Sequence, residues 1–209
     1  MAQKLGPPPT AAKLRGIAPD IHVLRAGSLV WRVYFRGGPH PGTWNAFRSF
    51  GPTGARFDHQ SPPRRVHPTR TILYAAESGP TCVAEVFQDT RVIDRSANTP
   101  ALVAFRTRRD VSLLDVTDAW PTRAGASMAI NSGSRSMARR WSRAIYGAYP
   151  KVQGIYYASS MNANQPAFAL CERAGAAVPA APALDLLLFD PGLAAVLAAA
   201  ATRFGYAVV

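Results

Sequence analysis

Residues 71–87, TILYAAESGPTCVAEVF, carry a strong local signal for the fold. TILYAAE is rich in strand-forming residues, and in the residues after it Ser78 suits a helix N-cap and Pro80 a first turn. Four apolar residues then recur at helical spacing: Cys82, Val83, Val86 and Phe87. The stretch therefore predicts a strand that leads into a helix, with Glu85 flanked by the buried stripe.

Glu85 is unusual because the chain has 24 Lys+Arg against 12 Asp+Glu, and its glutamates are Glu77, Glu85 and Glu172 alone. A carboxylate in this setting either points outward from the helix or is held near an apolar wall for chemistry. Glu77 is the rival for a chemical role, but it lies at the start of the helix, where the helix dipole favours an acid. Motifs elsewhere in the chain are needed to choose between these possibilities.

The segments before this unit predict a strand and a long loop. Residues 27–35, GSLVWRVYF, suit a strand bounded by glycine. Residues 37–70 are crowded with Gly and Pro, which predicts a long ordered loop with at most a short strand over Ala55–Phe57. We expect the Gly-rich part of this loop, residues 37–54, to cover a ligand.

The segments after it alternate irregularly between strand and helix patterns. Strands are predicted at 101–109, 111–117, 154–160, 167–174 and 185–190, and helices over 125–150 and after Asp190, before Gly205 and a closing strand. No fixed-period repeat appears. This order favours a single α+β domain over a doubly wound sheet.

Composition sets the broad class. With 209 residues and 48% hydrophobic residues, the chain suits one globular domain. We expect residues 1–25 to form a flexible basic leader and residues 26–209 to form the domain. Cys82 and Cys171 lie in apolar surroundings and predict buried thiols in a reducing compartment. The sequence shows neither a signal peptide nor a membrane span, so we expect a cytoplasmic protein.

The net charge of +12 predicts an anionic partner without identifying it. The basic residues are scattered and match no nucleic-acid-binding motif, which argues against nucleic acid as a partner of this chain alone. The histidines lack Cys or carboxylate neighbours at ligand spacing, so we expect no metal site and solvated loop positions for them: His22, His40, His59 and His67.

Five short motifs follow one another along the chain: WRV, GxRF, LYxAES, AEVF and YxSS. In this order they make the chain resemble the RES-domain family, the toxin half of many bacterial toxin–antitoxin pairs. The resemblance extends from about Leu29 to Val209. The family's functional residues fall on five positions here: Arg32, Arg56, Tyr74, Glu85 and Ser159.

The resemblance implies an ADP-ribosyltransferase-like fold, with mixed sheets and flanking helices, and an activity that consumes NAD+. Glu85, Arg32 and Ser159 would be catalytic, and Arg56 and Tyr74 would bind NAD+. An Xre-type antitoxin is the implied partner. The chain departs from the family pattern after the serine, where MNANQP stands, so the acceptor of ADP-ribose stays open between phosphate, water and a protein. Because Ser160 adjoins Ser159, the choice of serine is also open.

Elementary chemistry fits these roles. Cleaving the nicotinamide–ribose bond of NAD+ releases a neutral ring and leaves positive charge on the ribose, so one carboxylate can suffice. The planar guanidinium group of arginine suits the diphosphate, and the face of a tyrosine ring suits the cationic nicotinamide ring. Ser159 could orient Arg32 or the nicotinamide amide.

Simpler readings remain for the same residues. Glu85 could be a surface residue, Arg32 could pair with an aspartate, and Tyr74 could belong to the core. Two other functions also stay open: ADP-ribosylation of a host protein, and a non-enzymatic basic module that binds RNA or an acidic partner. The RNA reading draws on the net charge and on the aromatic-rich loop from Trp44 to Phe57.

Overall fold

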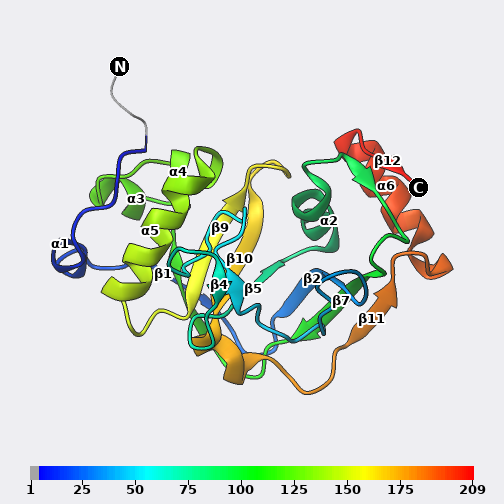
Figure 1. Ribbon diagram of the computed structural model, residues 1–209, viewed down its shortest axis with the longest axis horizontal. Coiled ribbons are helices and arrows are strands. Elements are labelled where there is room, and N and C mark those ends of the chain that lie inside the picture. Colours follow the sequence, from blue (N-terminus) through cyan, green and yellow to red (C-terminus); the bar gives the residue numbers. More distant parts are fainter. Residues whose placement is uncertain (1–4) are drawn as a thin grey trace.

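The protein, seen here as a computed structural model that describes residues 5–209, is built on an eight-stranded sheet (Figure 1). The strand order is β1-β8-β9-β10-β5-β2-β7-β11, and neighbours are antiparallel except for the parallel pair β8 and β9. The strands are β1 (Ile21–Leu24), β2 (Leu29–Phe35), β5 (Ile72–Ala76), β7 (Pro100–Arg106), β8 (Val111–Asp115), β9 (Gly154–Ser159), β10 (Gln165–Cys171) and β11 (Leu184–Leu187). The mixed sheet confirms the predicted α+β class.

The helices gather at two ends of this sheet, as Figure 1 shows. One group lies beside β1 and β9: α1 (Ala11–Arg15), α3 (Trp120–Arg123), α4 (Ala129–Ser132) and α5 (Arg135–Ala148). The other group lies beside β2 and β11: α2 (Gly79–Phe87) and α6 (Ala194–Phe204). Short elements complete the chain: β3 (Phe50–Gly51) with β4 (Arg65–Val66), β6 (Val92–Ile93) with β12 (Ala207–Val208), and the 3-10 turns Glu172–Ala177 and Pro191–Leu193.

The predicted strand–helix unit is β5 followed by α2. The Ser78 side chain accepts a hydrogen bond from the Thr81 amide, and Pro80 lies in the first turn, as the sequence predicted. Cys82, Val83 and Phe87 are buried, but Val86 is 37% exposed. The difference arises because one side of α2 borders a cleft instead of packing against the core.

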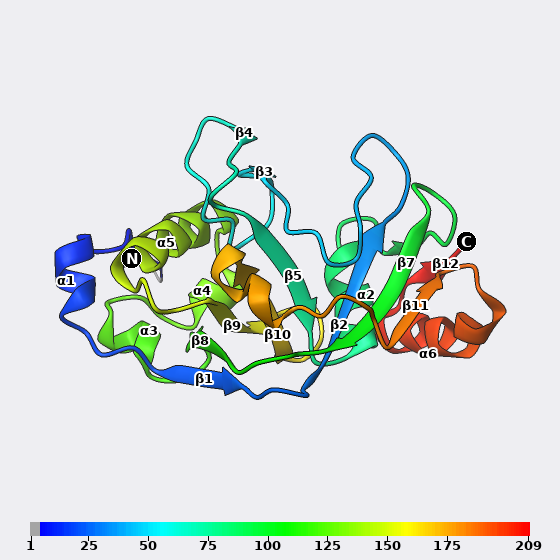
Figure 2. The same cartoon turned by 90° about the horizontal axis from the view of Figure 1, so that it is seen from below.

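The sheet divides between β2 and β5, and this division positions the site. The two strands pair only at Trp31 and Ala76, whereas β2 pairs with β7 over its whole length and β5 pairs with β10 throughout. Beyond that contact the strands separate, as Figure 2 shows. Side chains on the separated halves therefore face a gap that opens within the sheet.

The prediction of a flexible leader over residues 1–25 is wrong for the part that the structure describes, residues 5–25. Leu14 of α1 is completely buried, and the Tyr149 hydroxyl donates to its carbonyl at 2.8 Å. β1 pairs with β8 at the end of the main sheet. The triple proline ends before α1 begins, so it does not interfere with the helix. Residues 1–4 lie outside the described residues.

The short strand predicted over Ala55–Phe57 is also wrong, because these residues form a turn. The strands of the long loop are instead β3 and β4, which pair as a two-stranded ribbon. Phe57 is completely buried, and its amide donates to the Tyr74 hydroxyl at 3.0 Å. These contacts fix the turn beside β5.

Other predictions hold with adjustments. The segments 101–109 and 111–117 contain β7 and β8, which do not pair with each other but lie apart in the sheet. The helical segment 125–150 is interrupted at Gly133, which separates α4 from α5. Cys82 and Cys171 are buried and free, as predicted. Within residues 5–209, no helix is both long enough and apolar enough to span a bilayer.

Candidate active site

A cleft of about 530 Å³ lies where β2 and β5 separate. Its walls come from these strands, the outer side of α2, the start of α5 and residues 53–56 of the long loop. Four of the predicted site residues line it: Arg32, Arg56, Tyr74 and Glu85. Segments far apart in the sequence thus meet at one cavity.

The fifth predicted residue, Ser159, contacts Glu85 directly. Ser159 ends β9 and is completely buried, and its hydroxyl donates to the Glu85 carboxylate at 2.5 Å. The Met161 amide in turn donates to the Ser159 oxygen at 3.3 Å. The hydroxyl therefore orients the carboxylate from below the cleft surface.

The neighbouring serine has a different place. Ser160 is exposed and lines the cleft, whereas Ser159 is buried against Glu85. Of the two, only Ser159 donates a hydrogen bond to the predicted catalytic carboxylate in the part of the chain that the structure describes. The geometry thus favours Ser159 as the positioning serine and leaves Ser160 available to contact a ligand.

Glu85 is held in an environment that opposes its ionisation. Burial raises the pKa of its carboxyl above the ordinary value, while the Ser159 hydrogen bond and the charges of Arg56 and Arg135 act against that rise. The carboxylate is thus poorly hydrated yet flanked by cations. A group held in this way interacts strongly with positive charge that develops nearby.

Among residues 5–209, no aspartate forms an ion pair with Arg32. Its guanidinium donates to the carbonyls of Trp44 and Ala46, each at 2.9 Å. Burial lowers its pKa to about 10, so it remains charged at neutral pH. These bonds tie β2 to the long loop and leave the other guanidinium hydrogens for a ligand.

Arg56 lines the cleft from the long loop. It donates to the Gly133 carbonyl, just before α5, at 2.6 Å. Burial lowers its pKa, as does the nearby charge of Arg135, while Glu85 raises it. Two crowded cations favour an anion between them.

The hydroxyl of Tyr74 is already hydrogen-bonded within the protein. The hydroxyl donates to Asp58 at 3.0 Å and accepts from the Phe57 amide, and burial raises its pKa well above the ordinary value. Tyr74 also lines a second hollow of about 50 Å³. The residues that line this hollow are mostly apolar and include Glu85. They are Val33, Tyr74, Ala75, Ala76, Cys82, Glu85, Val86 and Tyr157.

The sequence did not reveal Asp58, which organises one wall. Its carboxylate is completely buried and accepts from Arg48 at 2.6 Å, from Tyr74 at 3.0 Å, and from the Thr53 amide and hydroxyl at 2.5 and 2.9 Å. All three partners line the cleft. Its position directly after the GARF motif was the available signal.

Arg135 is another residue that sequence reasoning missed. It is the first residue of α5 and donates to Gln88 at 2.5 Å and to Asp89 at 3.4 Å, across from α2. It therefore bridges the two walls of the cleft. Only its contacts with Gln88 and Asp89, which directly follow α2, identify it, because its local sequence is that of an ordinary basic helix.

The histidines differ from the prediction of solvated loop positions. His59 and His67 are buried, at 3% and 8% exposure, and burial lowers the pKa of His59 to about 4. The His59 Nε2 atom lies 3.5 Å from Glu172. Among residues 5–209, no group of three or more His, Cys, Asp or Glu side chains is arranged to hold a metal ion.

The aromatic loop does not form the stacking surface that the RNA reading required. Phe57 is buried, and Trp44 packs against Phe105 with ring centroids 5.5 Å apart. Phe47 packs against the same cluster of core residues, while Phe50 is 40% exposed. These rings mainly anchor the loop to the sheet.

Comparisons with known proteins agree with this architecture. The family described as "RES domain" matches residues 29–196. The crystal structure of the M. tuberculosis MbcT–MbcA toxin–antitoxin complex contains a chain with a similar fold, at 16% identity and a TM-score of 0.53. The similarity covers 90% of this chain and 96% of that chain. A comparison with curated proteins gave no match.

Proposed function

This chain belongs to the RES domain family, and on that premise we propose that it is a toxin that cleaves the nicotinamide–ribose bond of NAD+ and transfers ADP-ribose to phosphate or water. The observation that carries the proposal is the Glu85–Ser159 pair at a cleft lined by arginines. A half-buried, oriented carboxylate facing guanidiniums fits a substrate with a cationic sugar and an anionic diphosphate.

The reaction needs one carboxylate and no acid on the leaving group. The C1′–N bond breaks and its electron pair returns to the pyridinium nitrogen, so nicotinamide leaves as a neutral molecule. Glu85 stabilises the positive charge that develops on the ribose. An oxygen of phosphate or water then bonds to C1′, and an attacking water loses its proton to solvent.

The arginines supply the binding energy for the diphosphate. Arg32 and Arg56 both line the cleft, and each keeps guanidinium hydrogens beyond those used in its backbone hydrogen bonds. Paired N–H donors match phosphate oxygens well. Binding the diphosphate between them would place the adjoining ribose near Glu85.

The hollow beside Tyr74 suits the nicotinamide. It is bounded by Tyr74, Tyr157 and small apolar side chains, and Glu85 lies at its edge. An aromatic wall attracts the cationic ring with about 0.5–2 kcal/mol. That attraction is largest before cleavage, so the neutral product is released more easily than the substrate.

The proposal includes an antitoxin as the partner of this chain. The similar chain of known structure was crystallised in a toxin–antitoxin complex. We extend this to an antitoxin partner of the Xre type for the present chain, and to the cytoplasm as the compartment, because NAD+ is available there.

Purified protein incubated with NAD+ is expected to release free nicotinamide, measured by chromatography. If phosphate is the acceptor, turnover rises with phosphate concentration, and mass spectrometry shows phosphorylated ADP-ribose. With water as the acceptor, ADP-ribose forms at a rate independent of phosphate. Absence of nicotinamide release, with or without phosphate, would contradict the proposal, and a mass gain on an added host protein would indicate the protein-modifying alternative.

Replacing Ser159 by alanine is expected to move the acid limb of the pH–rate profile to higher pH. Burial raises the pKa of Glu85 and the Ser159 hydrogen bond lowers it. Loss of the hydroxyl therefore raises the pKa further, and the ionised form that the reaction needs appears only at higher pH. The measurement is kcat/KM for nicotinamide release across the acidic and neutral range.

Ser160→Ala is the matched control because Ser160 is adjacent and, within residues 5–209, the hydrogen bond to Glu85 comes from Ser159 instead. Its acid limb should coincide with that of the original protein. A shift in Ser160→Ala without one in Ser159→Ala would assign the functional serine to position 160.

A further inference from the structure

A cluster of arginines lies outside the cleft, on α5 and on the loop that carries β4. We call it the arginine face, formed by Arg65, Arg70, Arg139, Arg140 and Arg143. The charges of Arg139, Arg140 and Arg70 all lower the pKa of Arg143, after the larger effect of burial, so these four side chains lie close together. Arg65 and Arg70 line one shallow pocket of about 410 Å³.

This face lacks compensating charge. In residues 5–209, no carboxylate lies within 4.0 Å of any of these five guanidiniums. Arg139 and Arg143 are one turn apart on α5, and like charges at that spacing destabilise a helix. An arrangement that costs stability in the isolated chain becomes favourable when an anionic partner covers it.

Exposed apolar side chains adjoin the arginines. Val66, which lines the same pocket, is 59% exposed, and its cross-strand partner Phe50 is 40% exposed. Figure 2 shows β3 and β4 projecting from the body of the molecule next to α5. Arg48 and Thr53, on either side of β3, line the cleft. A partner seated on this ribbon would therefore overhang the cleft.

We propose that the arginine face and the β3–β4 ribbon form the docking surface for an acidic protein that presents apolar side chains beside its carboxylates. Arginine and aromatic side chains around apolar contacts are typical of protein interfaces. Tyr146, the ring that Arg70 covers, is also stacked on His59 and covered by Arg173, so it offers no free face to a base. A polynucleotide would find phosphate contacts and the ring of Phe50 for stacking, but Val66 would remain uncovered.

The test uses two fluorescein-labelled probes of equal charge in low salt, with fluorescence anisotropy as the readout. One is a peptide with four Glu-Glu-Leu repeats, and the other is an oligothymidylate with the same number of negative charges. We expect Arg140→Glu/Arg143→Glu to weaken peptide binding by about tenfold or more, because attraction becomes like-charge repulsion. Val66→Ser should weaken the peptide and leave the oligothymidylate unchanged.

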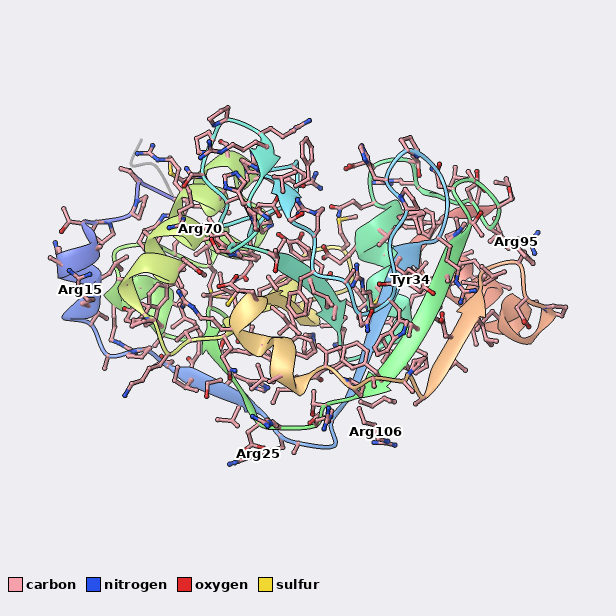
Figure 3. The ribbon with its side chains drawn as sticks, turned by 60° about the horizontal axis from the view of Figure 1, so that its bottom comes forward. Arg15, Arg25, Tyr34, Arg70, Arg95 and Arg106 are labelled. Atoms are coloured by element: carbon pink, nitrogen blue, oxygen red, sulfur yellow. The ribbon has the colours of Figure 1, made fainter. Side chains whose placement is uncertain are left out.

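Arg108→Glu/Arg109→Glu is the matched control, with the same change in net charge. The two control residues lie between β7 and β8, close in sequence to Arg106, which Figure 3 places at the bottom of the view, away from Arg70. The peptide affinity of this control should stay within about twofold of the original. Arg140, Arg143 and the control residues do not line the cleft, so a melting temperature that is not lowered, together with unchanged nicotinamide release, confirms intact folding.

Three outcomes would overturn the proposal: no peptide binding at low salt, equal loss in the two double variants, or tighter binding of the oligothymidylate with the same dependence on Arg140 and Arg143. The last would assign the surface to nucleic acid. Binding is measured without NAD+, so these outcomes are independent of whether the cleft cleaves NAD+.

Discussion

Glu85→Gln is expected to lower the rate of nicotinamide release by about a hundredfold or more. The amide keeps the shape of the side chain and can still accept the Ser159 hydrogen bond, but it lacks the charge that stabilises the developing cation. Loss of one preorganised electrostatic contact in such a site costs about 2.7–4 kcal/mol of transition-state stabilisation. Single-turnover rates of nicotinamide release measure the effect on the chemical step.

Glu77→Gln provides the matched control. Glu77 is exposed, lies immediately before the N-cap of the same helix, and does not line the cleft. We expect its rate to stay close to that of the original protein. Nearly full activity in Glu85→Gln, or a large loss in Glu77→Gln, would remove Glu85 from the catalytic role.

The stability of Glu85→Gln should move in the opposite direction from its activity. The folded pKa of Glu85 is raised above its unfolded value. Its ionised form therefore costs stability, and this cost appears as pH rises from the unfolded pKa through the folded pKa. A neutral amide avoids the cost, so the melting temperature at neutral pH should equal or exceed that of the original protein. Such a result separates lost chemistry from lost folding.

Asp58→Ala is expected to destabilise the fold by about 3 kcal/mol, because removing one partner of a buried pair leaves the other uncompensated. Asp58 is the completely buried acceptor for Arg48, Thr53 and Tyr74. For a chain of this size the loss corresponds to a fall in melting temperature of about 6–12 °C. Thermal unfolding followed by circular dichroism measures it.

Asp110→Ala is the control for this variant. Asp110 also accepts hydrogen bonds from an arginine and a backbone amide, Arg25 and Ala26, but that pair is largely exposed. Exposed ion pairs contribute little to stability, so its melting temperature should fall much less. Equal falls in the two variants would show that Asp58 is not an unusually important anchor of the cleft wall.

Much of the site could be predicted from short segments. Ser78 and Pro80 mark the start of α2, and the apolar spacing after them gives its period, because capping and helical periodicity act within a few residues. The motif order then selected Arg32, Arg56, Tyr74, Glu85 and Ser159, and four of these line one cleft while the fifth contacts Glu85.

The errors occurred where long-range contacts override local signals. Residues 5–25 are basic and interrupted by prolines, which is typical of a flexible segment, yet Leu14 is buried against α5 and β1 completes the sheet. The turn at Ala55–Phe57 replaces a strand because Phe57 is buried and its amide is bound by Tyr74. Neither partner is near in sequence.

The sequence by itself determined the class of fold, the β5–α2 unit and the residue types required for the chemistry, since those depend on local propensity and on composition. Only the tertiary structure decided that β2 and β5 separate, that Ser159 and not Ser160 contacts Glu85, and that Asp58 holds the cleft wall. The physical reason is that strand pairing and burial join residues far apart in the chain. Which residues are joined depends on the free energy of the whole packed sheet, and this cannot be inferred from any short segment.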